Sequence, residues 1–232
     1  MSATVDGAAA VFDLDGTLVD TAADLIEGAN RRLSALGLSG RLDPVADAGI
    51  AGRGGKAMLR LGYERSSVSF AEADVDAAWP GFIEDYEAVI ARESRFFPGA
   101  LDAVEALRAA GWRIAICTNK PERLARRLLD ALGEAERFQA LIGADTLPVR
   151  KPDPAPFHAA VRDAGGAPGR GVMIGDTVTD RRTAAAAGAP CVLMDLGTSA
   201  DDLRSVGAEA VLRDYAELPA TLTALAGGGS GP

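Results

Sequence analysis

The stretch VFDLDGTLVD, residues 11–20, places two carboxylates two positions apart directly after an apolar run, and a Gly-Thr pair follows them. Asp-Gly is a strong hairpin signal, but a hairpin needs a second strand of alternating polarity immediately afterwards. The next residues instead repeat apolar side chains at helical spacing, and Gly37 stands where such a helix would end. A strand that ends in acids and leads into a helix is typical of an α/β crossover.

The rest of the chain alternates short apolar runs with segments long enough for a helix. This alternation indicates βαβ units and a parallel sheet, and runs without polar alternation indicate that both faces of the sheet are covered. Proline near the start and glycine after the end mark helices within 98–111 and 121–133, and Gly188 marks the end of a helix within 179–188. The expected strands are 8–13, 112–118, 138–144, 171–176, 189–195 and 208–214.

Residues 21–94 break the alternation, because they show helical periodicity, as in 71–93, and no convincing strand. We therefore expect an α/β fold with a Rossmann-like parallel sheet core, residues 1–20 and 95–232, and an inserted all-helical cap domain, residues 21–94. The glycine-rich end, residues 226–232, predicts a flexible tail.

Charge and hydropathy exclude several classes of partner. The formal net charge of −9 argues against a nucleic-acid or anionic-membrane surface, since both need clustered Lys and Arg. No apolar stretch reaches the roughly 18 residues of a membrane span, and the N-terminus lacks the basic start of a secretory signal. We expect a cytoplasmic protein with a small-molecule partner. Cys117 and Cys191 lie in apolar runs and are expected to be buried thiols.

Polar residues follow the expected strands at the ends where open parallel sheets bind ligands. Several carboxylates in one crevice repel each other unless a hard cation lies among them. Oxygen ligands from only two or three side chains suit Mg²⁺, because this ion also keeps bound waters and a substrate phosphate oxygen as ligands. The expected site therefore takes both a metal ion and a phosphate. Its members are Asp13, Asp15, Thr118, Asn119, Lys151, Asp176 and Asp180.

The segments DLDGTLVD (13–20), CTNK (117–120), RKPDP (150–154) and GDTVTD (175–180) occur in this order along nearly the whole chain. This set resembles the haloacid dehalogenase superfamily, specifically its phosphatases with a helical cap. The resemblance implies that Asp13 is a nucleophile that forms an aspartyl-phosphate, and that Asp15 acts as acid and base.

The resemblance also implies a role for each other site residue. Mg²⁺ would be bound by the carboxylates of Asp13 and Asp176 and by the backbone carbonyl of Asp15. The phosphoryl oxygens would be held by Thr118, by the backbone N–H of Asn119 and by Lys151, with Asp180 orienting Lys151 or a metal-bound water. Outside this set, Thr17 and Asp20 are expected only to cap the following helix.

The glycine-rich stretch AGRGGKAMLRLG, residues 51–62, lies within the expected cap. It is not a nucleotide-binding P-loop, because Ala57 stands where Ser or Thr must bind Mg²⁺. In similar capped phosphatases a loop at this place closes over the active site, which makes Arg53 a candidate for binding a substrate carboxylate. The alternative for Arg53 is an exposed basic helix start.

Three functions stay open. The first is a small-metabolite phosphatase, and the opening, the cap length and the segment FFPGALDAVEAL (96–107) most resemble bacterial members that hydrolyse 2-phosphoglycolate. The second is a phosphomutase of the β-phosphoglucomutase type, which shares the core. The third is a non-catalytic relative that only binds its ligand.

Overall fold

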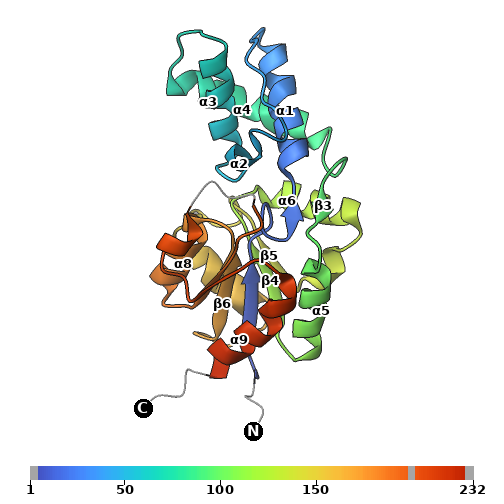
Figure 1. Ribbon diagram of the computed structural model, residues 1–232, viewed down its shortest axis with the longest axis vertical. Helices are drawn as coiled ribbons and strands as arrows, with labels where there is room; N and C mark the ends of the chain where they lie inside the picture. Colours follow the sequence, from blue (N-terminus) through green and yellow to red (C-terminus); the bar gives the residue numbers. More distant parts are fainter. Residues whose placement is uncertain (1–4, 198–201, 228–232) are drawn as a thin grey trace. The chain divides into compact units, whose positions relative to one another are not determined.

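The computed structural model describes residues 5–197 and 202–227 (Figure 1). The chain divides into two compact units, one formed by Met1–Val19 with Phe96–Pro232 and the other by Asp20–Arg95. The first contains the main β-sheet and is called here the sheet unit. The second consists mainly of helices and is called the helical unit.

A parallel sheet forms the centre of the sheet unit, and all the strands expected from the sequence are present within its described residues. They are β1 (Ala9–Phe12), β4 (Arg113–Cys117), β5 (Ala140–Ile142), β6 (Gly171–Gly175), β7 (Cys191–Met194) and β8 (Ala210–Leu212). Their spatial order is β5-β4-β1-β6-β7-β8. Val11 in β1 pairs with Ala115 on one side and Met173 on the other. The direction of the crossovers therefore reverses at β1, which is the place where open α/β sheets bind ligands.

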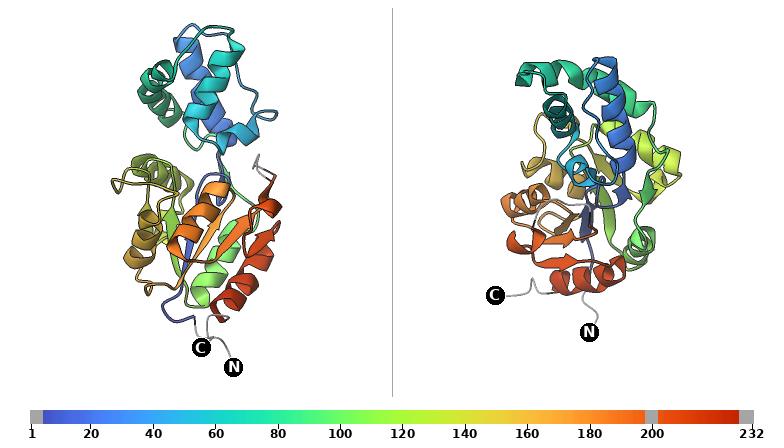
Figure 2. Two further views of the ribbon diagram at one scale, coloured as in Figure 1. Left: turned by 90° about the vertical axis from the view of Figure 1, so that its left-hand side faces the viewer. Right: turned by 45° about the horizontal axis from the view of Figure 1, so that its top comes forward.

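Helices cover both faces of this sheet (Figures 1 and 2), as the unbroken apolar runs indicated. They are α5 (Ala100–Ala109), α6 (Glu122–Leu132), α7 (Ala155–Asp163), α8 (Val178–Ala187) and α9 (Leu218–Gly227). α7 and α8 contact each other on one face, and α5 and α9 contact each other on the opposite face. Every residue of β1 is completely buried between these layers. The α/β class with a Rossmann-like core is thus confirmed.

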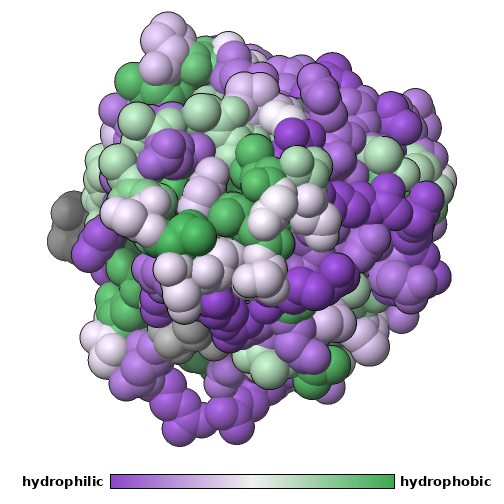
Figure 3. Space-filling view, turned by 90° about the horizontal axis from the view of Figure 1, so that it is seen from above, coloured by the Kyte–Doolittle hydropathy of each residue, from purple (hydrophilic) through white to green (hydrophobic). Residues whose placement is uncertain are grey.

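The helical unit contains α1 (Ala22–Ala35), α2 (Ala48–Ala51), α3 (Gly55–Arg65) and α4 (Glu72–Glu87). α1 packs against α3 and α4, and the side chains of Leu33, Met58 and Phe82 are fully buried among them. On the face shown in Figure 3, hydrophilic residues predominate and apolar residues lie among them. Such a mixture is ordinary for a protein surface.

The helix expected over residues 71–93 ends earlier, at Glu87. The chain turns instead at Ala91, whose φ is 62°. The buried carboxylate of Asp24 at the start of α1 accepts the backbone N–H groups of Glu93 and Ser94. These bonds satisfy two backbone N–H groups that would otherwise need helical partners. Hydrophobic periodicity does not reveal such a contact with a distant residue.

A two-stranded sheet of β2 (Val19–Asp20) and β3 (Arg95–Phe96) was missed. Strands of two residues are too short to show alternation, so the sequence did not predict these two, which lie on either side of residues 21–94. Of the expected flexible tail, residues 226 and 227 belong to α9, and 228–232 lie outside the described residues.

Cys117 and Cys191 are buried free thiols, as expected. In the described ranges no helix is long and apolar enough to span a membrane.

Candidate active site

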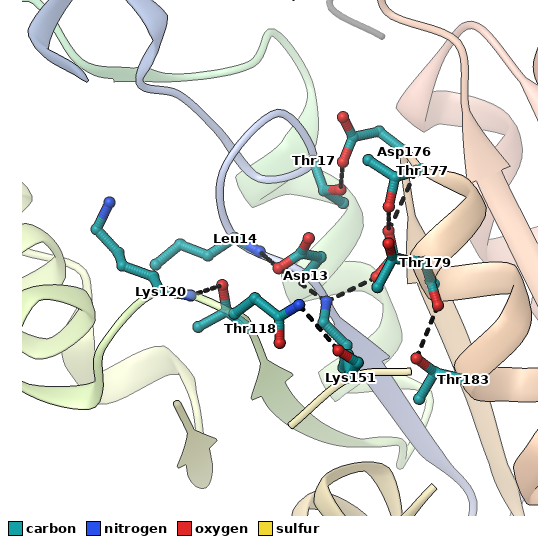
Figure 4. A network of polar contacts seen from close by, with 12 residues as sticks. Asp13, Leu14, Thr17, Thr118, Lys120, Lys151, Asp176, Thr177, Thr179 and Thr183 are labelled. Atoms are coloured by element: carbon teal, nitrogen blue, oxygen red, sulfur yellow. Dashed lines mark hydrogen bonds and ion pairs between the residues drawn. The ribbon is translucent and has the colours of Figure 1, made fainter. Parts of the chain in front are cut away.

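Residues that follow three strands meet at the carboxyl end of the sheet (Figure 4). Asp13 comes directly after β1 and Asp176 directly after β6, so the neighbouring strands bring the two acids together. The backbone N–H of Asp13 donates to the Ile174 carbonyl at 2.8 Å. Thr118 follows β4, and its backbone N–H donates to the Ile142 carbonyl at 2.9 Å. Strand pairing thus fixes the backbone at the start of each loop of the site.

Lys151 lies between two of the acids. Its Nζ is 3.1 Å from Asp13 Oδ1 and 2.6 Å from Asp180 Oδ1, and its side chain is only 2% exposed. The side-chain amide of Asn119 donates to the backbone carbonyl of Lys151 at 3.1 Å. Burial alone would lower the pKa of Lys151, but Asp13 and Asp180 outweigh burial and raise that pKa above its ordinary value. Lys151 therefore stays a cation between carboxylates.

One carboxylate oxygen from each of Asp13, Asp176 and Asp180 lies within 4.8 Å of the other two. Asp180 has both oxygens engaged, one by Lys151 and the other by the backbone N–H and hydroxyl of Thr177. Asp176 is completely buried, and within the described residues its Oδ2 has no hydrogen-bond partner. An unpaired buried carboxylate oxygen is costly, and oxygen ligands of this kind suit a hard divalent cation. The acidic cluster can therefore bind a metal ion.

The pKa shifts of the acids agree with that reading. Burial raises the pKa of Asp13 to about 6; Lys151 opposes this rise, and Asp180 and Asp15 add to it. Burial, together with the charges of Asp180 and Asp13, raises the pKa of Asp176 well above its ordinary value. A dication among these carboxylates would offset both effects by favouring their ionised forms.

Lys120 is a site residue that the sequence reasoning missed. Its Nζ lies 2.8 Å from Asp15 Oδ1, and its side chain is 3% exposed. The available signal was its position in CTNK, two residues after Thr118 in the same loop. Sequence separation hid the pairing, since Asp15 and Lys120 are 105 positions apart.

Thr17 was wrongly assigned to helix capping. Its hydroxyl donates to Asp176 Oδ1 at 2.7 Å, and its backbone carbonyl accepts a hydrogen bond from the Tyr215 hydroxyl. The chain turns at Gly16, where φ is 79°, and Thr17 is completely buried. Asp20 accepts the backbone N–H of Ala22 at 3.2 Å, as a residue near a helix start does.

Arg53 belongs to the helical unit. It is exposed in the turn between α2 and α3. The described geometry of the sheet unit brings together Asp13, Asp15, Thr118, Asn119, Lys151, Asp176 and Asp180.

Comparison with known proteins places this arrangement in a family. The family model of haloacid dehalogenase-like hydrolases matches residues 8–188. This chain belongs to the haloacid dehalogenase-like hydrolases. Phosphoglycolate phosphatase from Caulobacter vibrioides is 39% identical to this hydrolase over 216 residues, which cover 93% of this chain and 90% of that protein.

Solved structures agree with the family assignment. A predicted phosphoglycolate phosphatase from Haemophilus somnus is 26% identical, with a TM-score of 0.81, and the match covers 93% of this chain and 97% of that one. A mutant of CbbY from Rhodobacter sphaeroides, in complex with xylulose-(1,5)bisphosphate, is also 26% identical; its TM-score is 0.75, and the match covers 92% of this chain and 98% of that one. The family model and the similarity to phosphoglycolate phosphatase over most of the chain show that this hydrolase is a phosphatase.

Gly16 provides a direct test of the acidic cluster. A Cβ at this position would overlap Asp176 Oδ2, and the φ of 79° is strained for alanine by about 1–2 kcal/mol. We expect Gly16→Ala to displace the Asp176 carboxylate and to lower kcat/KM at least about tenfold, since 1.4 kcal/mol is a tenfold effect.

The matched control is Gly133→Ala. Gly133 has a φ of 76° at the end of α6, and nothing lies within 4 Å of an added Cβ. Thermal melting should show similar backbone strain in both variants, and phosphate release should fall only in Gly16→Ala. Equal activities of the two variants would contradict the importance of the Asp176 position.

Proposed function

We propose that this phosphatase hydrolyses 2-phosphoglycolate, with Mg²⁺ as its metal ion and a covalent aspartyl-phosphate on Asp13 as the intermediate. The observation that carries the proposal is the Asp13 carboxylate, which follows β1, lies beside Lys151 and belongs to the acidic cluster. The substrate is suggested by the Caulobacter vibrioides relative, which is named for phosphoglycolate.

In the first half-reaction, Asp13 attacks the phosphorus atom and the ester oxygen leaves. Asp13 Oδ1 accepts the Leu14 N–H at 2.7 Å and faces Lys151, which leaves Oδ2 as the attacking atom. Asp15 gives a proton to the departing oxygen as the bond from phosphorus to that oxygen breaks. The products of this step are glycolate and phosphorylated Asp13.

In the second half-reaction, water attacks the same phosphorus atom and Asp15 takes up its proton. The bond between Asp13 and phosphorus breaks, which restores the carboxylate and releases inorganic phosphate. Asp15 thus returns to the protonation state in which the next cycle begins.

The remaining residues hold the group being transferred. We assign Thr118, the Asn119 backbone N–H and Lys151 to the phosphoryl oxygens, where preorganised donors stabilise developing charge. Asp180 keeps Lys151 in place through the 2.6 Å contact. Mg²⁺, held by the carboxylates of Asp13 and Asp176 and the Asp15 carbonyl, would supply charge neutralisation at the phosphate.

The helical unit is assigned the role of a cap that selects the substrate, with Arg53 as its candidate carboxylate ligand. Arg53 is exposed and follows the short helix α2. A guanidinium can pair with a carboxylate through two parallel hydrogen bonds.

The test is a screen of phosphate esters with Mg²⁺, scored by free phosphate. We expect 2-phosphoglycolate to give the highest kcat/KM, of at least about 10⁴ M⁻¹s⁻¹ as for ordinary enzyme–substrate pairs. The panel should include glucose 1-phosphate and other sugar phosphates. Isomerisation of a sugar phosphate without release of phosphate would instead support a phosphomutase. A strong preference for an uncharged ester would contradict the proposed substrate.

A further inference from the structure

The Lys120 side chain has a position that the reaction steps above do not use. Its side chain is almost completely buried, although moving a charged side chain out of water is costly. Pairing with Asp15 compensates part of that cost, but buried ion pairs contribute little net stability compared with apolar residues. The stability of the fold is therefore a weak reason for a lysine here, and a function at the site is a better one.

Hydrogen bonds hold the backbone of Lys120 at both its N–H and its carbonyl group. Its backbone N–H donates to the Thr118 hydroxyl at 3.2 Å, and its carbonyl accepts the backbone N–H of Ala144 at 3.0 Å. In Figure 4 its side chain extends away from the Asp13–Lys151 pair. The two lysines thus serve different positions: Lys151 faces Asp13, and Lys120 faces Asp15.

A group beside Asp15 is close to the part of the substrate that carries the carboxylate. Asp15 must reach the ester oxygen of the substrate, because that oxygen receives its proton. In 2-phosphoglycolate a single CH₂ group separates this oxygen from the carboxylate carbon. A cation 2.8 Å from Asp15 Oδ1 therefore lies next to the region that the substrate carboxylate occupies.

The charges of the site favour the same assignment. Within the described residues, the site holds four carboxylates, those of Asp13, Asp15, Asp176 and Asp180, and two ammoniums, those of Lys120 and Lys151. A divalent cation would balance this excess of negative charge. Lys151 is already shared by two carboxylates at the phosphoryl position. The substrate carboxylate therefore requires another cation, and Lys120 is suitably placed.

We infer that Lys120 binds the carboxylate of the substrate and makes the sheet unit itself selective for phosphate esters that carry a carboxylate one carbon from the ester oxygen. This inference rests on the proposed function and deepens it. It assigns the carboxylate to Lys120 of the sheet unit in place of Arg53, the candidate carboxylate ligand of the helical unit.

The experiment compares two substrates of the same shape, 2-phosphoglycolate and the phosphate monoester of glycolamide, in which an uncharged amide replaces the carboxylate. For each variant the measured quantity is kcat/KM for 2-phosphoglycolate divided by kcat/KM for the amide ester. We expect Lys120→Met to lower the ratio by about 10- to 100-fold, the effect of losing one charged hydrogen bond. Lys120→Arg keeps the positive charge, so its ratio should lie much closer to that of the parent chain.

The matched control is Lys56→Met, which removes a lysine that pairs with an aspartate at 2.6 Å on the exposed surface of the helical unit. It should leave the ratio unchanged. Arg53→Ala provides the competing test. Melting temperatures of all variants identify any that fail to fold; if Lys120→Met is among them, Lys120→Gln, which also removes the charge, is measured instead and should lower the ratio in the same way.

Three results would overturn the inference. An equal loss on both esters in Lys120→Met would mean that Lys120 acts only through Asp15. A ratio that falls in Arg53→Ala and not in Lys120→Met would assign the carboxylate to the helical unit. A parent chain that releases phosphate equally well from both esters would show no carboxylate recognition. By contrast, a parent chain that hydrolyses other esters but not 2-phosphoglycolate would refute the proposed substrate itself.

Discussion

Asp13→Asn is expected to keep the fold of the parent chain and to retain less than about a hundredth of its kcat. The amide has the shape of the carboxylate, and its oxygen can still accept the Leu14 N–H that Asp13 accepts at 2.7 Å. An amide oxygen is a poor nucleophile, so the covalent route through Asp13 is lost. The loss should exceed the roughly 10²-fold effect typical of one acid–base contact.

The measurement combines free-phosphate kinetics with circular dichroism and thermal melting. Asp102→Asn is the matched control, because Asp102 is an exposed acid in the first turn of α5. It should keep the parent kcat. A folded Asp13→Asn protein with more than about a hundredth of the parent kcat would refute the assignment of Asp13 as nucleophile.

Removal of the metal ion is expected to abolish activity. Excess EDTA should reduce phosphate release to background, and Mg²⁺ should restore it. Ca²⁺ should restore little, because it takes more oxygen ligands in a looser geometry than Mg²⁺. The carboxylates of Asp13 and Asp176 would lose the cation that balances their charge. Full activity in excess EDTA would contradict the metal requirement.

The pH dependence of stability gives a second readout of the same site, without substrate. Burial raises the pKa of Asp13 from 3.8 to about 6 in the metal-free chain. The stability linked to this carboxyl is therefore complete below pH 3.8 and is lost as the pH rises through about 6. Protons and Mg²⁺ compete for the carboxylate, so metal binding strengthens as the pH rises through the same range.

Thermal melting with Mg²⁺ and with EDTA measures this effect. We expect the rise in Tm caused by Mg²⁺ to be larger at a pH of about 8 than at about 5. The raised pKa of Asp176 acts in the same direction. A shift of equal size at both pH values would argue that Mg²⁺ binds elsewhere.

Much of the sheet unit follows from local patterns. Each strand of the main sheet is a short apolar run, and α6 and α8 end at Gly133 and Gly188, as the sequence indicates. Because parallel strands bring their carboxyl ends to one edge, the nearness of Asp13 to Asp176 also follows from the order of strands and acids. These features depend on neighbouring residues or on one general rule of sheet topology.

Other features were decided by tertiary structure alone. Thr17 and Asp176 are 159 positions apart, and Tyr215 reaches Thr17 over 198 positions. Asp15 and Lys120 pair across 105 positions. The sequence alone determined which chemical groups the chain carries at its strand ends. Which of them pair was decided only by packing, because a hydrogen bond or ion pair between distant residues depends on side-chain directions and burial, and neither leaves a periodic signal in the local sequence.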